Sequence, residues 1–332
     1  MKILRINIYL MAIVLLIAQS QLINAQSFSY KITDKVLIGG GSKWDYLSID
    51  TVNHKLYISH GSSVNIMDMN TNKLAGEITD LKGVHGIAFS YESGKGFITN
   101  GSDNSVTVFD LKTFKVISNI KITGEKPDAI SYDPYTKRIF TSNGDTNDAT
   151  AIDAVTGTVV GTVKLDGAPE SSVSNMKGKM FVNLEKENMI NVFDPKELKV
   201  IAKWPLAPCE TPTGIAMDYK NNRIFAGCRN KLMAVVNAET GKVIITLPIG
   251  SGVDACAYDP ELKLVFCSNK EGTITVIKQE SKDKYNVLEN IKTLEGAKTM
   301  AIDKKTHRIY TSAVIPGENN QKSFGVLVLE KN

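Results

Sequence analysis

A single pattern recurs along this chain and restricts the folds open to it: an apolar strand ending in Asp, a short turn that often carries a basic residue, and then Ile, Leu or Val followed by Tyr or Phe. Clear copies occupy residues 46–50 with 55–57 and residues 300–303 with 308–310. The anchors fall at 50, 90, 133, 175, 218, 259 and 303, with weaker copies at 90 and 175. Successive anchors lie 40 to 44 residues apart, so the sequence consists of seven units of about 42 residues.

Each unit contains a second landmark, an alternating strand that ends in Asp or Asn and is followed by a turn and another strand. In residues 149–157 the turn begins at Asp153 and closes at Gly157. Asp accepts hydrogen bonds from turn amides and Gly permits positive φ, so this segment joins two strands. Four strands per unit, without a sustained helical period, predict an all-β chain.

Four-stranded units of this length are typical of β-propeller blades, which bury their faces by stacking around an axis. We therefore expect an all-β, seven-bladed propeller. Its last unit supplies only three strands, at 299–303, 307–312 and 324–330, whereas residues 30–39 form a strand without a unit. We expect this N-terminal strand to complete the seventh blade and close the ring, which removes two exposed sheet edges.

Residues 1–25 have the composition of a secretory signal peptide. Lys2 and Arg5 precede an uncharged apolar run over 6–18, and a polar stretch ends at Ala25, the small residue that cleavage requires. The apolar run is shorter than the ~20 residues that span a bilayer, which disfavours the alternative of a membrane anchor. We expect cleavage after Ala25 and a periplasmic or secreted, monomeric domain over 26–332 with no membrane span.

The charge balance gives no electrostatic case for binding nucleic acid. The chain has 39 Lys and Arg against 35 Asp and Glu, and removing Lys2 and Arg5 leaves 37 cations against those 35 carboxylates. A nearly neutral domain lacks the basic footprint that nucleic acid binding requires.

The repeat resembles that of the YncE-like, YVTN-repeat β-propellers that bacteria secrete. The resemblance covers the whole mature chain, and its most specific segments are 44–47 (WDYL), 84–86 (VHG), 126–129 (KPDA), 208–214 (PCETPTG) and 227–233 (GCRNKLM). It implies a seven-bladed periplasmic or secreted propeller, and it implies no established reaction.

The start of each innermost strand faces the axis of a propeller, so one position per unit contributes to a circle of side chains at the channel mouth. Counting five residues back from each anchor gives Asp45, His85, Asp128, Glu170, Thr213, Asp254 and Lys298. Converging ionisable groups are costly unless they are hydrated, paired or bound to a ligand. We interpret the circle as a ligand-binding site, with a water-filled funnel as the alternative.

Three further features bear on this site. A hard divalent cation, Ca²⁺ or Mg²⁺, would suit the carboxylate oxygens. Trp44 at the rim would stack on a ligand or act as a plug. Arg229 would bind an anion, and its alternative is a surface ion pair with Glu210.

The four cysteines permit two disulfides. Cys209 and Cys228 map to neighbouring segments of the fifth blade, and export favours a disulfide between them. Cys256 and Cys267 lie on paired strands of the sixth blade, where they would form either a bridge or two buried thiols, and we favour the thiols.

Two functions fit these observations. The first is a non-catalytic extracytoplasmic binding protein that holds a small ligand, an ion or a partner protein at the channel mouth. The alternative is a metal-assisted lyase or hydrolase of the kind seen in streptogramin-lyase-type propellers, in which a divalent ion acts as Lewis acid and His85 or a carboxylate moves the proton.

Overall fold

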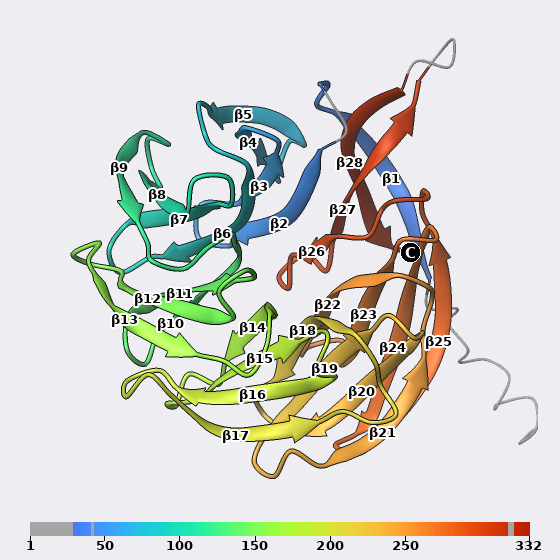
Figure 1. Cartoon of the computed structure of the whole chain (residues 1–332). Coiled ribbons are helices and arrows are strands. Elements are labelled where there is room, and N and C mark those ends of the chain that lie inside the picture. Colours follow the sequence, from blue (N-terminus) through green and yellow to red (C-terminus); the bar gives the residue numbers. More distant parts are fainter. Residues whose placement is uncertain (1–28, 41–42, 318–321) are drawn as a thin grey trace, which may run out of the picture.

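A computed structural model describes residues 29–40, 43–317 and 322–332, so the expected signal peptide over 1–25 lies outside the described residues. The described chain forms seven four-stranded antiparallel sheets arranged as blades around an axis (Figure 1). This confirms the predicted all-β, seven-bladed propeller. Within the described ranges there is no helix of the length and apolarity needed to cross a membrane.

Six blades take their strands in chain order, from the innermost strand outward. Blades one to three consist of β2 (Trp44–Asp50), β3 (Lys55–His60), β4 (Ser63–Asp68) and β5 (Lys73–Ile78); β6 (Val84–Ser90), β7 (Lys95–Asn100), β8 (Ser105–Asp110) and β9 (Val116–Lys121); and β10 (Pro127–Asp133), β11 (Arg138–Asn143), β12 (Asp148–Asp153) and β13 (Val159–Lys164). Blades four to six consist of β14 (Pro169–Ser174), β15 (Met180–Leu184), β16 (Met189–Asp194) and β17 (Lys199–Pro205); β18 (Pro212–Asp218), β19 (Arg223–Cys228), β20 (Leu232–Asn237) and β21 (Val243–Pro248); and β22 (Val253–Asp259), β23 (Leu264–Asn269), β24 (Thr273–Ser281) and β25 (Lys284–Lys292).

The seventh blade joins both ends of the described chain. It contains β26 (Met300–Ile302), β27 (Ile309–Pro316), β28 (Lys322–Lys331) and, outermost, β1 (Tyr30–Leu37). Figure 1 shows β1, in blue, lying beside β28, in dark red. The register runs from Tyr30 opposite Lys331 to Leu37 opposite Gly325, which is consistent with the predicted closure of the ring by the N-terminal strand.

Apolar residues on the middle strands of each blade form the core between blades. Tyr57, Phe109 and Ile98 bury their side chains completely between blades one and two, and Phe225 and Val265 do so between blades five and six. Each innermost strand contacts the innermost strands of both neighbouring blades, and β26 contacts β2, so the ring is continuous. Stacking thus buries both faces of sheets that are individually too small to be stable.

Aspartates at the strand ends form the turns, as the repeat predicts. Asp50 Oδ1 accepts hydrogen bonds from the amides of Val52 and Asn53, at 3.1 and 2.9 Å. Asp153 Oδ1 accepts from Val155 and Thr156 in the same way, at 2.9 and 2.8 Å. These local bonds set the turn at the end of each strand.

Candidate functional site

The innermost strands of blades one to six share a register irregularity at the channel mouth. In blade one it falls between Trp44 and Leu47, and in blade three between Pro127 and Ile130. The irregularity in each blade spans the residue that the repeat assigned to the mouth: Asp45, His85, Asp128, Glu170, Thr213 and Asp254. A bulge bends the strand and changes the direction of one side chain, so the site is built on a repeated backbone feature.

Side chains from the preceding blade hold the backbone of these bulges. Thr99 Oγ1 donates to the carbonyl of Asp128 at 2.6 Å, and Ser142 Oγ donates to that of Glu170 at 2.7 Å. In the same way Asn183 Nδ2 donates to the Thr213 carbonyl at 3.0 Å. At the start of blade seven, Ser268 Oγ donates to the Lys298 carbonyl. The mouth is therefore fixed by contacts between blades, which the sequence pattern did not reveal.

Asp45, His85 and Asp128 form the closest group at the mouth. His85 Nδ1 lies 2.7 Å from Asp45 Oδ2, to which it donates a hydrogen bond, and 3.6 Å from Asp128 Oδ1. One ligand atom from each of the three residues falls within 4.8 Å of the other two, and no other such group of His, Cys, Asp or Glu occurs in the described ranges. Two carboxylates and an imidazole form a donor set for a divalent cation.

The electrostatics of this group show a shortage of positive charge. Burial raises the pKa of Asp128 to about 6, with a further contribution from the Asp45 carboxylate that His85 partly offsets. The hydrogen bond to Asp45 raises the pKa of His85 against the effect of burial. Asp128 Oδ1 is also buried without a hydrogen-bond partner in the described part of the chain. A carboxylate that retains its proton to this pH lacks a full counter-charge.

The opposite side of the mouth is built from ion pairs. Lys298 Nζ lies 2.7 Å from Asp254 Oδ2, and Arg229 Nη2 lies 2.9 Å from Glu185 Oε1 and 3.8 Å from Asp254 Oδ1. Burial disfavours the charge on Lys298, but the Asp254 carboxylate outweighs it and raises the Lys298 pKa. The structure therefore pairs Arg229 with Glu185 and Asp254, in place of the surface pair with Glu210 that was the alternative.

Glu170 is influenced by charges on both sides of the mouth, and its pKa has the largest resolved shift among the mouth carboxylates. Burial raises its pKa to about 9, and the Glu185 and Asp128 carboxylates add to the effect while Arg229 opposes it. Burial also raises the pKa of Asp254, which its two cations only partly lower. In all, five carboxylates, Asp45, Asp128, Glu170, Glu185 and Asp254, share Lys298 and Arg229 as cations.

Tyr46 is a member of the site that the sequence analysis missed. Burial raises its pKa well above the usual value, and the carboxylates of Asp128, Asp45, Glu170 and Asp254 all contribute. The phenol therefore lies within electrostatic range of carboxylates from four blades. The signal lay in the alignment of the units, because the equivalent residues are all small: Gly86, Ala129, Ser171, Gly214, Ala255 and Thr299.

The structure gives two expected residues of the mouth other surroundings. Thr213 is only 1% exposed, and its hydroxyl donates to the Val253 carbonyl at 2.9 Å. Its role in the described structure is an inter-blade hydrogen bond. Trp44 stacks on Phe324, with ring centroids 5.2 Å apart, and its indole Nε1 is buried with no hydrogen-bond partner in the described ranges.

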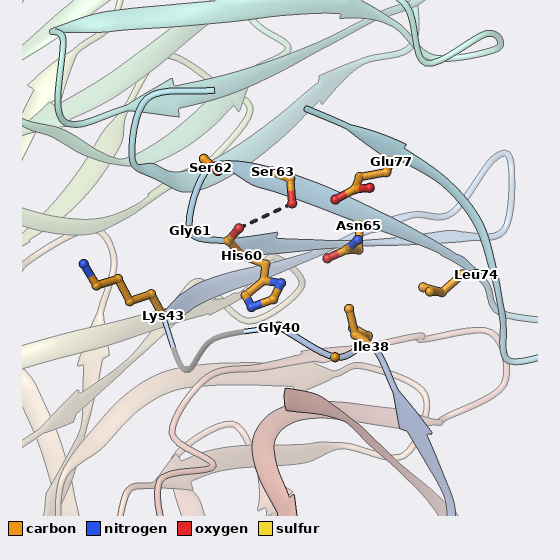
Figure 2. Close-up of a pocket in the computed structure, with 11 residues that line it drawn as sticks. Ile38, Gly40, Lys43, His60, Gly61, Ser62, Ser63, Asn65, Leu74 and Glu77 are labelled. Atoms are coloured by element: carbon orange, nitrogen blue, oxygen red, sulfur yellow. Dashed lines mark hydrogen bonds between the residues drawn. The ribbon is translucent and has the colours of Figure 1, made fainter. Parts of the chain in front are cut away.

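Two pockets that share Lys43 and Gly61 open next to the mouth. The smaller, about 250 Å³, is lined by Trp44, Asp45 and His85 together with Lys43 and Gly61. The larger, about 670 Å³, shares Lys43 and Gly61 and extends over blade one, as Figure 2 shows. Its other labelled lining residues are Ile38, Gly40, His60, Ser62, Ser63, Asn65, Leu74 and Glu77. The two pockets thus share part of their lining next to the mouth.

The four cysteines are free thiols in the structure. Cys209 and Cys228 are both buried, and a hydrogen bond from Cys209, together with burial, raises the Cys228 pKa. Both are free thiols in the described structure, and the disulfide expected between them stays a prediction. Cys256 and Cys267 are also free thiols in the structure, with their sulfur atoms 3.3 Å apart, and the choice between a bridge and two thiols stays a prediction.

The fold and the mouth define the class of this protein: a seven-bladed β-propeller, a fold that commonly serves for binding or as a scaffold. Solved structures support the fold. The RRP9 WD40 repeats are 9% identical, with a TM-score of 0.79 over 92% of this chain and 100% of that chain. The U3-55K structure is 8% identical, with a TM-score of 0.77 over 91% and 98%.

A chain of the Kuenenia stuttgartiensis hydrazine synthase structure is also similar, at 15% identity, with a TM-score of 0.72 over 84% of this chain and 94% of that chain. At these identities the likeness shows the fold alone. No protein-family model and no curated protein sequence matches the chain.

Proposed function

We propose that this protein is an extracytoplasmic binding propeller of the YVTN-repeat type, and that its channel mouth holds a divalent cation, alone or as part of a small ligand. The carrying observation is the group of Asp45, His85 and Asp128, whose donor atoms lie within 4.8 Å of one another. The ligand would supply the positive charge that the raised pKa values of Asp128 and Glu170 indicate is lacking.

The chemistry of the group supports a cation that accepts both nitrogen and oxygen ligands. Imidazole suits Zn²⁺ and other transition metals, and carboxylates suit Mn²⁺, Mg²⁺ and Ca²⁺. Because His85 belongs to the group, we expect Zn²⁺ or Mn²⁺ to bind more tightly than Ca²⁺ or Mg²⁺. This ordering refines the hard-cation expectation drawn from the carboxylates alone.

Binding without catalysis accounts for the mouth with the fewest assumptions. Arg229 and Lys298 both form ion pairs with carboxylates of the protein, so their charges are already balanced without a substrate anion. The alternative of a metal-assisted lyase or hydrolase has one observation in its favour. Asp45 orients His85 at 2.7 Å, as a carboxylate orients a general base.

The test is calorimetric titration of the metal-free protein with Zn²⁺, Mn²⁺, Ca²⁺ and Mg²⁺ chlorides at pH 7.5. We expect one site, and we expect Asp45→Asn with Asp128→Asn to weaken binding at least tenfold while the far-UV spectrum is unchanged. The matched control is Glu197→Gln, an exposed carboxylate on a turn at the opposite end of blade four. Equal affinity in the double variant and the control would refute the proposal.

The compartment has its own test. Expression of the full chain in a bacterial host should give a mature protein that begins at Gln26, identified by intact mass in the periplasmic or culture fraction. Recovery of the unprocessed chain from the cytoplasm alone would count against export and leave the cation site unaffected.

A further inference from the structure

The pair of thiols in blade six lies outside the mouth and is used by none of the functions above. Cys256 in β22 and Cys267 in β23 are directly opposite each other in the antiparallel register, and their Sγ atoms are 3.3 Å apart. We infer that Cys256 and Cys267 form a dithiol–disulfide site that reacts with small-molecule disulfides and closes to a cross-strand disulfide.

The backbone geometry permits this bond without moving the strands. Residues directly opposite in an antiparallel pair have Cα atoms roughly 4.5 to 5.5 Å apart, inside the roughly 4.4 to 6.8 Å range of disulfides. The sulfur atoms need only close from 3.3 Å to the bonded distance of about 2.05 Å. Rotation about the two Cα–Cβ bonds supplies a movement of this size.

The two cysteine residues differ in exposure, and this difference sets the order of the reaction. Cys256 is half-buried, whereas Cys267 is completely buried in the core between blades five and six. The hydrogen bond with Cys256, together with burial, raises the pKa of Cys267. An external disulfide therefore meets Cys256 first.

The chemistry balances in two exchange steps. The Cys256 thiolate attacks one sulfur of a disulfide RSSR, so that a Cys256–S–S–R bond forms, the RS–SR bond breaks and the first RS⁻ leaves and takes up a proton. The Cys267 thiolate then attacks Cys256 Sγ and expels the second RS⁻. The two thiols are oxidised by two electrons, and RSSR is reduced to two RSH.

The other pair of cysteines provides an internal comparison. Cys209 and Cys228 are 1% and 0% exposed, so both sulfurs are closed to an external disulfide in the folded protein. Spacing along the repeat had favoured that pair as the disulfide. In the folded chain we expect Cys256 and Cys267 to react first, because exchange with an external disulfide requires one accessible sulfur.

The experiment incubates the reduced, folded protein with oxidised glutathione, alkylates the remaining thiols and digests with trypsin. Lys and Arg residues separate the four cysteines into the peptides 204–220, 224–229, 243–263 and 264–270. We expect a linked species of 243–263 with 264–270 to form first. Under the same conditions Cys267→Ser should accumulate a stable glutathione adduct on Cys256, and Cys256→Ser should leave Cys267 unreacted.

Three results would overturn the inference: linkage of 204–220 with 224–229 before the other pair, a persistent glutathione adduct on Cys256 of the parent protein, or no reaction of Cys256 while the thiols remain reduced. The fold of each variant is checked by its thermal unfolding midpoint. The Cys209→Ser, Cys228→Ser double variant keeps the test intact, because the expected product contains neither residue.

Discussion

Lys298 Nζ lies 2.7 Å from Asp254 Oδ2, so the last blade is joined to the sixth by an ion pair at the channel mouth. The Asp254 side chain is 15% exposed and that of Lys298 is 35% exposed. Removing one partner from a largely buried pair leaves a charge with poor solvation. The pair therefore has a measurable part in stability as well as in the shape of the site.

Lys298→Met should destabilise the protein by about 1 to 2 kcal/mol at pH 7.5, a value reduced for the exposure of the lysine. The Lys298→Met, Asp254→Asn double variant should recover part of that loss, because the carboxylate that lost its nearest cation is then neutralised as well. Urea unfolding of both single variants and the double variant gives the coupling free energy. Additive effects of the two changes would show that the contact contributes nothing.

Affinity for the cation should rise with pH between 5 and 8. Asp128, with its pKa raised to about 6, must lose its proton to become a ligand, and so must His85, whose pKa is also raised. Below pH 6 we expect a loss of roughly tenfold per pH unit for each proton displaced. Calorimetry in two buffers of different ionisation enthalpy measures the protons released, and binding with no proton release at pH 6 would contradict this account.

Glu170→Gln should stabilise the protein in a pH-dependent manner. The folded state raises this pKa from 4.5 to about 9, so the wild type is at no disadvantage below pH 4.5 and loses stability as pH rises toward 9. Gln cannot ionise, so the variant avoids that loss. We expect Glu170→Gln to be more stable than the wild type by about 1 to 3 kcal/mol at pH 8. This value is reduced from about 1.4 kcal/mol per pKa unit because Glu170 is partly exposed. Thermal melts from pH 4 to 9 test this, with Glu197→Gln as the control that should show no such trend.

Tyr46→Phe should reduce cation affinity more at pH 6 than at pH 8. The phenol of Tyr46, whose pKa is raised by burial and the nearby carboxylates, stays protonated, so its O–H dipole is available to stabilise them. Without it the pKa of Asp128 should rise, and we expect a severalfold loss at pH 6. Tyr46→Ala should in addition cost about 2 kcal/mol of stability, less than a fully buried aromatic. A loss independent of pH would indicate a purely steric role.

Deletion of residues 26–38 should destabilise the ring strongly, because it removes β1 and exposes the edge of β28. The matched control is a circular permutant in which β1 follows β28. The residues to be joined are already adjacent in the parent protein, since the Asn332 amide donates to the Ser29 carbonyl at 2.9 Å. We expect aggregation of the deletion on gel filtration and a native-like melt for the permutant, and equal melts of the two proteins would show that closure is dispensable.

Most of the fold was predictable because its determinants are local. Asp50 and Asp153 form their turns with amides two and three residues away, and that spacing is written directly in the chain. The strand and turn pattern of one unit is weak evidence for a blade, but its recurrence in seven units makes the prediction firm. The missing strand of the last unit identified the role of β1, and its pairing with β28 is consistent with that prediction.

The mouth was only partly predictable. Position in the repeat located Asp45, His85 and Asp128, which the structure brings together. The position in the repeat also predicted Thr213 as a mouth residue. A single sequence does not distinguish a hydroxyl that faces the axis from one that donates a hydrogen bond to the next blade. Tyr46 was not predicted because it occurs once, and a repeat indicates only positions that recur.

The sequence by itself determined the number of blades, the turns and the position in each unit from which side chains reach the channel, since strand alternation and turn chemistry act over a few residues. Only the tertiary structure decided which of those side chains meet and what charge they carry. Asp45, Asp128 and Glu170 lie in three different blades, and a pKa depends on burial and on distances between such groups. Those distances exist only once the ring has closed.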